Sequence, residues 1–215
     1  MSKAILLHSG GLDSSLLGVK LANEGADVVS VFVHFGQNAK ENELAAVRKT
    51  TDLLGLPLEV LDASGLRSAF TASALSLMRV MPNPGKGVLP LGSLLLYGPA
   101  MAYANQIGAR KIYVGLTKLD ADFSPEYSES FLKAYASLAS IAGCDAIEIE
   151  APFLTQTKGS ILQLASSTEL ATRIVESSWS CVHSNDIHCG SCEGCRSRKV
   201  AFSESGMEDK TLYAG

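Results

Sequence analysis

The sequence has no long basic run, no leader of the secretory type and no internal repeat, and these absences exclude several classes of protein. Its 215 residues carry a formal net charge of −4, which excludes the broad basic surface of a protein that binds duplex nucleic acid. The first apolar run, Ala4–Leu7, is too short for the core of a signal peptide. We therefore expect a cytoplasmic protein without stable nucleic-acid binding, and local contact with RNA stays open.

Charged residues are also absent from Val88–Ala109, a stretch long enough to raise the question of a membrane span. The stretch contains Pro90, Gly92, Pro99 and Asn105, which interrupt the hydropathy that a span requires. A helix packed against the face of a sheet explains it better. We expect no membrane span.

Short apolar runs alternate with helical patterns along most of the chain. The expected strands are Ala4–His8, Val28–Phe35, Leu58–Asp62, Lys111–Leu116 and Ala146–Glu150. The expected helices are Asp13–Glu24, Glu41–Leu54, a helix from Ser93 to Gly108, Pro125–Ala142 and Thr157–Ala171. This alternation predicts the α/β class, with a doubly wound, parallel, five-stranded sheet that binds ligands at the carboxyl ends of its strands.

The most informative motif, Ser9-Gly-Gly-Leu-Asp-Ser14, directly follows the first expected strand. A glycine-bearing turn between a strand and a helix directs free backbone N–H groups at one point, which favours an anion such as phosphate. The motif has neither the lysine of a Walker A loop nor the third glycine of a dinucleotide fingerprint. It resembles the pyrophosphate loop of the ATP pyrophosphatase superfamily. The alternative is an ordinary turn in which Asp13 or a serine caps the helix.

We predict that the nucleotide contacts this loop and the residues beside it, and that Asp13 holds the Mg²⁺ bound to ATP. The predicted nucleotide-binding residues are His8, Ser9, Gly10, Gly11, Leu12, Asp13, Ser14 and Ser15.

Four of the five cysteines, Cys181, Cys189, Cys192 and Cys195, lie in one short stretch. Their C-x-x-C spacings predict a tetrahedral Zn²⁺ site, and four thiolates leave no open position, so the zinc would be structural. An iron–sulfur cluster, disulfides, or His183 or His188 in place of one thiolate are the alternatives. Cys144 is expected to be a free thiol without a nucleophilic role.

Two segments depart from the alternating pattern. Ala63–Pro90 is long, and we expect it to hold a short helix at Ala69–Met78 and to act as a lid or specificity loop. From Trp179 onward the composition shifts to cysteine, histidine and small polar residues. We predict a nucleotide-binding domain over residues 1–178 and a small zinc-binding appendage over residues 179–215.

The combination of the two motifs resembles the 7-cyano-7-deazaguanine synthase family (QueC, formerly ExsB). The resemblance rests on the order of its landmarks: Ser9–Ser14, Phe35-Gly36-Gln37, Glu43-Leu44-Ala45-Ala46, Ile112–Leu116, Ala151-Pro152, Thr157-Lys158, Ser180-Cys181, Cys189–Cys195 and Arg198. It implies an adenine nucleotide alpha hydrolase-like, Rossmann-like fold. It also implies that Gly36 and Gln37 belong to the nucleotide site and that relatives often form homodimers.

The activity that the resemblance implies is that of an ATP-dependent ligase. Such enzymes adenylate the carboxylate of 7-carboxy-7-deazaguanine, and ammonia then displaces AMP to give an amide, which a second activation converts to the nitrile on the route to queuosine. The segment Ser9–Ser14, called the glycine loop below, would hold the departing pyrophosphate. Lys158 is a candidate second clamp on phosphate, and its alternative is a solvated lysine in a first helical turn.

Two departures from the family pattern concern the substrate side. Gly92-Ser93 stands where the family usually carries Arg-Asn, and Asp120–Tyr127 is a shortened loop without arginine. Asp120, Asp122 and Tyr127 either line an altered pocket or, for the aspartates, form an ordinary acidic helix N-terminus. Three further functions therefore stay open: a paralogue with another carboxylate or acyl acceptor, a tRNA thiolase, and a non-catalytic zinc module.

Overall fold

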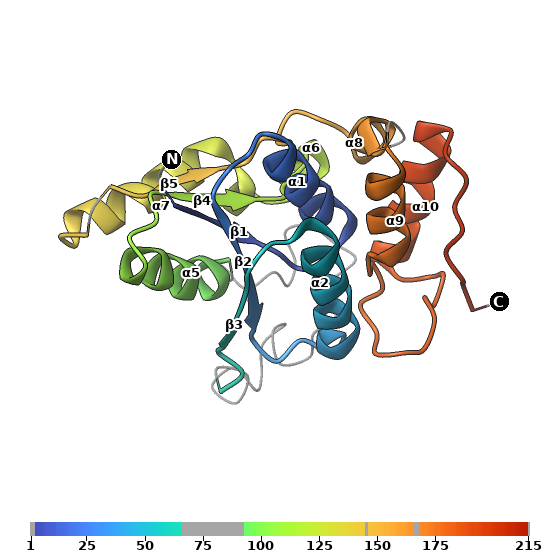
Figure 1. The fold of residues 1–215 in the computed structure, drawn as a ribbon, viewed down its shortest axis with the longest axis horizontal. Helices are drawn as coiled ribbons and strands as arrows, with labels where there is room; N and C mark the ends of the chain where they lie inside the picture. Colours follow the sequence, from blue (N-terminus) through green and yellow to red (C-terminus); the bar gives the residue numbers. More distant parts are fainter. Residues whose placement is uncertain (1–2, 66–92, 145, 166–167, 215) are drawn as a thin grey trace.

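The computed structural model describes residues 3–65, 93–144, 146–165 and 168–214 (Figure 1). Five parallel strands form one sheet in the order β3-β2-β1-β4-β5. The strands are β1 (Ala4–Leu7), β2 (Val28–His34), β3 (Leu58–Asp62), β4 (Lys111–Val114) and β5 (Glu148–Glu150). This confirms the predicted α/β class and five-stranded parallel sheet. The strand order reverses between β1 and β4, and ligands bind at such a switch point.

Helices cover both faces of the sheet (Figure 1). Helices α1 (Leu12–Asn23) and α2 (Lys40–Leu54) lie on one face, and α5 (Leu94–Gln106) and α7 (Glu129–Ile141) lie on the other. Alternate residues of β1 pack into the hydrophobic cores on the two faces of the sheet. Leu6 packs in the core that contains α1, and Ile5 packs in the core that contains α5 and α7. This division follows from the two-residue period of a strand.

Three helices near the C-terminus pack outside α1: α8 (Lys158–Ala165), α9 (Glu169–Ser177) and α10 (Glu193–Ser205) (Figure 1). Ala201 and Phe202 of α10 belong to the same hydrophobic core as Leu17 of α1. The C-terminal segment is thus fixed against the first helix. The division at residues 178 and 179 stays a prediction.

The region predicted as one helix over Pro125–Ala142 is broken in the structure. A 3₁₀ turn covers Pro125–Tyr127, Ser128 is extended, and α7 begins at Glu129, with the Ser128 hydroxyl accepting a 3.2 Å hydrogen bond from Phe131 N. A serine that can cap the next turn competes with continuation of the helix. The prediction of a single helix was wrong.

The predicted helix Thr157–Ala171 is also divided. Thr168 is extended (φ −141°, ψ 143°) and its side chain caps α9 by accepting from Ala171 N, so α8 and α9 are separate elements. Sequence analysis also missed α6 (Lys118–Phe123), which starts with a capping box between Thr117 and Asp120, and α10. Asp120 therefore serves as an acidic helix N-terminal residue, one of the two interpretations of it.

The predicted short helix Ala69–Met78 and nearly all of the Ala63–Pro90 segment lie outside the described residues. Within the described residues, none of the helices has both the length and the apolar character that crossing a membrane requires.

Candidate active site

The glycine loop lies between β1 and α1, where strand order reverses. Gly10 has φ +75°, and a Cβ added there would overlap the main-chain oxygen of Glu43 on α2. The Gly10 carbonyl accepts a 2.8 Å hydrogen bond from Trp179 N, which comes from the C-terminal segment. Only glycine fits this position without displacing α2.

Hydroxyl groups fix the rest of the loop. Ser9 Oγ lies 3.1 Å from Ser14 Oγ and accepts a 3.4 Å hydrogen bond from Gly11 N, and Ser14 Oγ donates to the Gly11 carbonyl at 3.2 Å. Gly11 is the N-cap residue of α1, and as a glycine it offers no side chain to cap the helix. A serine or Asp13 at the N-cap position, which the alternative interpretation would favour, is therefore absent, and the positive end of α1 faces the loop.

Gly115, directly after β4, closes the loop from behind. A Cβ on Gly115 would lie 2.7 Å from both the Cα and the N of Ser14. The first turn of α1 thus sits directly on the backbone at the end of β4, which fixes the direction of its N–H groups.

Asp13 and Lys158 meet in this pocket although they are 145 positions apart in sequence. Their side chains form an ion pair, and the Asp13 side chain is only 13 % exposed. Burial raises the pKa of Asp13 against the opposing effect of Lys158. Burial lowers the pKa of Lys158, but the charges of Asp13 and Asp120 outweigh it and hold that pKa above its usual value. The alternative for Lys158, a solvated lysine in a first helical turn, is wrong, because its side chain is mostly buried beside Asp13.

The second carboxylate oxygen of Asp13, Oδ1, is buried and has no hydrogen-bond partner in the described part of the chain. A buried carboxylate oxygen without a partner is costly. It is the type of ligand that Mg²⁺ accepts. The residues present therefore fit the predicted magnesium-holding role of Asp13.

His8 and Ser15 lie beneath the loop rather than in the pocket. His8 is 1 % exposed, with Nδ1 2.9 Å from Ser30 Oγ and Nε2 3.1 Å from Ser15 Oγ. Burial lowers the pKa of His8 to about 3, so the ring is neutral. Any contribution of His8 to nucleotide binding is therefore structural, through the position of the loop.

Gly36 and Gln37 follow β2, and Gly36 has φ +94°. Gln37 is nearly buried, and its Nε2 donates at 3.0 Å to Oε2 of Glu43. Glu43 itself lines the pocket with Ser9, Gly11 and Asp13. Sequence analysis named Glu43 only as a landmark, because an acid in a first helical turn has an ordinary explanation.

The C-terminal segment supplies the other wall of the pocket, which measures about 230 Å³. Its residues there are Trp179, Ser180, Gly194, Ser197, Arg198 and Ala201. A Cβ on Gly194 would overlap the Ser180 carbonyl, so the start of α10 lies directly against residue 180. Sequence analysis assigned none of these residues to the nucleotide site, because nothing local in the sequence indicates that the two segments meet.

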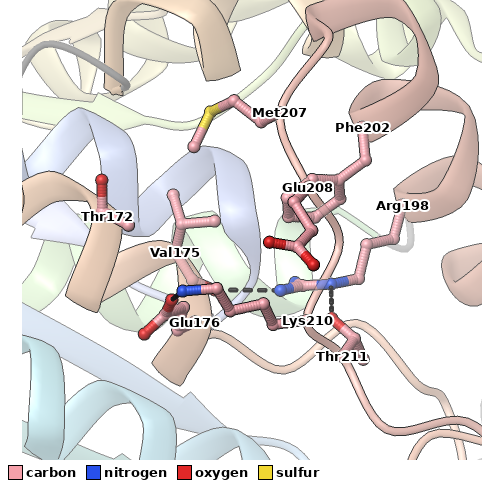
Figure 2. Close-up of a pocket in the computed structure, with 9 residues that line it drawn as sticks. All are labelled: Thr172, Val175, Glu176, Arg198, Phe202, Met207, Glu208, Lys210 and Thr211. Carbon is pink, nitrogen blue, oxygen red and sulfur yellow. Dashed lines mark hydrogen bonds and ion pairs between the residues drawn. The ribbon is translucent and has the colours of Figure 1, made fainter.

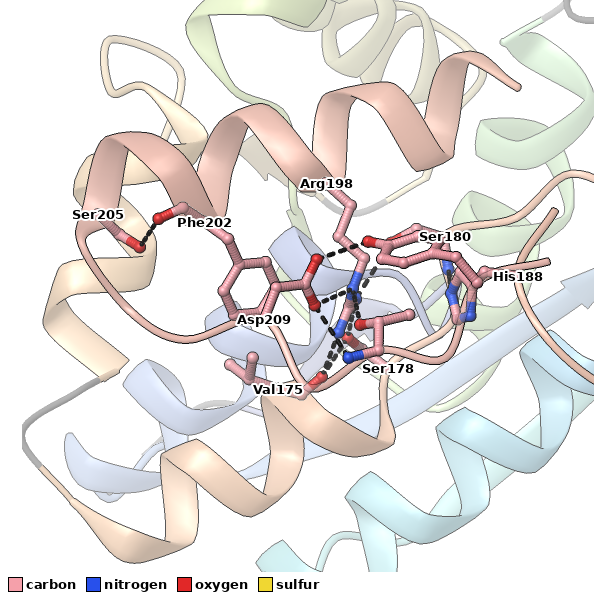
Figure 3. A network of polar contacts seen from close by, with 10 residues as sticks. Val175, Ser178, Ser180, His188, Arg198, Phe202, Ser205 and Asp209 are labelled. Atoms are coloured by element: carbon pink, nitrogen blue, oxygen red, sulfur yellow. Dashed lines mark hydrogen bonds and ion pairs between the residues drawn. The ribbon is translucent and has the colours of Figure 1, made fainter. Parts of the chain in front are cut away.

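Arg198 holds this wall together (Figure 3). Its guanidinium donates to Ser178 Oγ at 2.8 Å, Ser180 Oγ at 3.2 Å, the Val175 carbonyl at 2.9 Å and Thr211 Oγ1 at 2.7 Å. Asp209 lies 3.9 Å away, and Arg198 is 3 % exposed. A planar fork of donors suits this task. Because its donors are used in this way, Arg198 supports the pocket rather than offering a free cation to a ligand.

A second pocket, of about 220 Å³, lies on the other side of Arg198 (Figure 2). Glu176 and Lys210 form an ion pair at its edge, at 2.9 Å, and Val175, Phe202 and Met207 give it apolar walls. Glu176 and Lys210 are thus paired with each other.

The four cysteines come together as predicted. The sulfur atoms of Cys181, Cys189, Cys192 and Cys195 all lie within 4.8 Å of one another, and this was the only such group found among the described residues. Backbone N–H groups support the sulfurs, from Cys192 N to Cys189 Sγ at 3.3 Å and from Cys189 N to Cys181 Sγ at 3.4 Å. The donor set fits one soft, tetrahedral metal ion.

The two nearby histidines lie outside the sulfur cluster. His188 is buried, and its Nε2 accepts a 3.0 Å hydrogen bond from Ser180 N. Its ring lies 4.2 Å from that of Trp179. His183 is exposed. His188 therefore joins the cysteine segment to the pocket wall.

The region that departs from the family pattern, at the start of α5 and near α6, contains several acidic groups. Glu126 Oε2 accepts from Ser93 N at 2.9 Å and from Ser93 Oγ at 2.5 Å. Burial and the neighbouring acids raise the pKa of Tyr97 and Tyr127, so both phenols stay protonated. Ser93, at one of the positions where the family pattern differs, is thus held by a carboxylate.

Comparison with known proteins identifies relatives over nearly the full chain. The family model described as queuosine biosynthesis protein QueC matches residues 3–206. A 7-cyano-7-deazaguanine synthase from Methanocaldococcus jannaschii is 30% identical, covering 98% of this chain and 99% of the relative. The enzyme of the same name from a Marinomonas species is 32% identical, with 98% of each chain covered.

Solved structures show the same fold at low identity. The NMN synthetase from Francisella tularensis aligns with a TM-score of 0.55 and 14% identity, over 97% of this chain and 79% of that chain. At this identity the likeness concerns the fold alone. It agrees with the predicted adenine nucleotide alpha hydrolase-like architecture.

Proposed function

The chain belongs to the QueC family of queuosine biosynthesis proteins, and from this premise we propose that it is an ATP-dependent ligase that converts 7-carboxy-7-deazaguanine and ammonia to 7-cyano-7-deazaguanine. The observation that carries the proposal is the pocket at the glycine loop, where the uncapped start of α1, Asp13 and Lys158 meet. Family membership supplies the substrate class, and the pocket supplies a place for the nucleotide.

A carboxylate is a poor acyl donor, and adenylation gives it a leaving group. The uncapped N-terminus of α1 and the hydroxyls of Ser9 and Ser14 would hold the phosphates as charge develops on the departing pyrophosphate. Gly11, which lines the pocket, presents no side chain to a phosphate that approaches the backbone. The loop thus stabilises departure electrostatically, and the adenylate is left for attack by ammonia.

Asp13 would hold Mg²⁺ through its unpartnered Oδ1, while Lys158 neutralises charge on the other side of the pocket. Bound there, Mg²⁺ would supply charge neutralisation for the phosphate chain. The ion pair with Asp13 keeps Lys158 protonated and oriented until the nucleotide arrives.

The cysteine cluster would hold a structural Zn²⁺, since four thiolates leave no position for a substrate. The arrangement also requires reduced thiols, which supports a cytoplasmic location. Ammonia as nitrogen donor and a homodimeric state follow from the family resemblance and are part of the proposal.

A second candidate is a family member that adenylates a different carboxylate or passes the acyl group to another amine. The observation that favours it is the carboxylate of Glu126 bound to Ser93, at a position where the family usually carries Arg-Asn. An acid there changes the charge presented to a carboxylate substrate.

The test is to incubate the protein with ATP, Mg²⁺, ammonium chloride and 7-carboxy-7-deazaguanine, and to measure pyrophosphate release and the product mass. We expect stoichiometric pyrophosphate and the amide and nitrile masses. Asp13→Asn should abolish both, and Asp52→Asn, an exposed position on α2, should abolish neither. Pyrophosphate release with another purine-like carboxylate, but none with the deazaguanine acid, would favour the second candidate.

A further inference from the structure

Glu43 is a carboxylate in the wall of the nucleotide pocket that the proposed reaction has not yet used. It lies in the first turns of α2, with its main-chain oxygen against Gly10 and its side chain lining the pocket beside Ser9, Gly11 and Asp13. It therefore contacts the glycine loop through its backbone and forms part of the lining of the pocket.

A hydrogen bond from Gln37 fixes the orientation of this carboxyl group. Glu43 Oε2 accepts a 3.0 Å hydrogen bond from Gln37 Nε2, which also donates to the Val33 carbonyl at 3.2 Å. Gln37 Oε1 in turn accepts from Phe35 N at 3.0 Å. Because both ends of the Gln37 amide are engaged, Oε2 anchors the carboxyl group of Glu43 at the edge of the pocket.

The charges around Glu43 are unusual for a site that binds a polyanion. Asp13 on α1 is paired with Lys158 on α8, and the guanidinium of Arg198 on α10 is engaged with Ser178, Ser180, Val175 and Thr211. Within the described residues no cation pairs with Glu43. An ionised Glu43 would leave the pocket with one uncompensated negative charge, which opposes entry of phosphate.

Burial raises the pKa of Glu43 to about 7, against the opposing hydrogen bond from Gln37. A phosphate beside it would raise the pKa further, because like charges disfavour ionisation. A protonated carboxyl group gains an O–H donor. Proton uptake would thus turn a repulsive contact into a hydrogen bond.

We propose that Glu43 binds the phosphate chain of the nucleotide as a neutral carboxylic acid that donates a hydrogen bond, so that one proton enters the site with the nucleotide. The inference rests on the proposed function only for the claim that a nucleotide occupies this pocket. It assigns Glu43 a binding role distinct from that of Asp13, which forms an ion pair with Lys158.

The test is calorimetric titration with Mg²⁺ and α,β-methylene-ATP in buffers of different ionisation enthalpy, which reports the protons taken up. Above pH 7 the affinity of the unaltered protein should fall with rising pH, and the slope should approach roughly tenfold per pH unit near pH 8.5 as the uptake approaches about one proton. Glu43→Gln supplies a permanent neutral donor, so its affinity at pH 8.5 should exceed that of the unaltered protein and its uptake should be smaller by about one proton. Glu41→Gln, on the exposed side of the same helix, is the matched control and should behave like the unaltered protein.

Three outcomes would overturn the inference. Equal proton uptake in Glu43→Gln and Glu41→Gln would show that the proton binds elsewhere. Weaker binding by Glu43→Gln that appears only with Mg²⁺ would make Glu43 a metal ligand instead. No nucleotide binding by the unaltered protein would overturn the proposed function as well, so the two failures are distinguishable.

Discussion

Comparing Gly10→Ala with Gly25→Ala should separate the effect of Gly10 on the glycine loop from the loss of stability that any alanine causes at a positive φ. Gly10 and Gly25 have nearly the same backbone conformation, with φ +75° and +68°. An L-residue in this region costs about 1–2 kcal/mol. A Cβ on Gly25 would meet nothing within 4 Å, whereas one on Gly10 would overlap the Glu43 carbonyl. Gly25→Ala is therefore a matched control that carries the backbone cost alone.

For a chain of this size each kcal/mol shifts Tm by roughly 2–4 °C, so Gly25→Ala should lower Tm by roughly 2–8 °C and leave nucleotide affinity unchanged. Gly10→Ala adds the displacement of α2 and the strain on the 2.8 Å hydrogen bond from Trp179 N, a bond whose loss costs about 1 kcal/mol. We expect a larger fall in Tm and at least roughly a tenfold loss of affinity for ATP, since the N–H groups of the loop must move. Thermal unfolding and titration calorimetry measure the two effects. Equal Tm and equal affinity for the two variants would refute the reasoning.

Three further predictions concern the parts that support the loop. Cys192→Ser should lose bound metal and thermal stability, because metal binding and folding are coupled. The control variant Cys144→Ser should keep both. Equal zinc content in the two variants, measured by mass spectrometry, would contradict the assignment of the four cysteines as a metal site. Arg198→Lys keeps the charge but loses the fork of donors, and should cost about 2–4 kcal/mol in urea unfolding, whereas Arg196→Lys, on the exposed face of α10, should cost almost nothing. Burial lowers the pKa of His8 to about 3, below the value of about 6.5 for an unfolded imidazole. The unfolded state then binds more protons between these values, and stability should fall as the pH falls from 6.5 toward 3. A shallower pH dependence of the free energy of unfolding in His8→Gln would confirm this assignment, and an unchanged one would refute it.

The sheet was predictable because its signals are local. Each strand is a short apolar run between turn residues, and a parallel order follows from the intervening helices. The predictions of secondary structure were wrong where a single polar side chain determines the backbone conformation. Ser128 and Thr168 each cap a new helix with their own hydroxyl, and in the sequence both resemble helix interior. A pattern of apolar residues does not distinguish a capping serine from one that continues the helix.

In the candidate site, too, the parts with a local sequence signal were predictable and the parts that depend on long-range packing were not. Ser9–Ser14 and the four cysteines are contiguous motifs whose spacing carries the chemistry. Their partners are not contiguous: Lys158 reaches Asp13 across 145 positions, and Arg198 reaches Val175 and Ser178 from another helix. Such pairs depend on the packing of α8, α9 and α10 against α1, and no periodicity within a segment reports that packing.

Trp179 shows why the two motifs belong to one site. Its backbone N–H donates to the Gly10 carbonyl, and its indole Nε1 donates to the Cys181 carbonyl at 2.6 Å. Its ring contacts that of His188 in a tilted arrangement. A metal ion that fixes the position of Cys181 would thus also fix one of the hydrogen bonds that hold the glycine loop. The predicted boundary between residues 178 and 179 falls in this pocket wall. Removal of the metal should therefore weaken nucleotide binding even where the sheet stays folded, because the loop loses a support that the sheet does not provide.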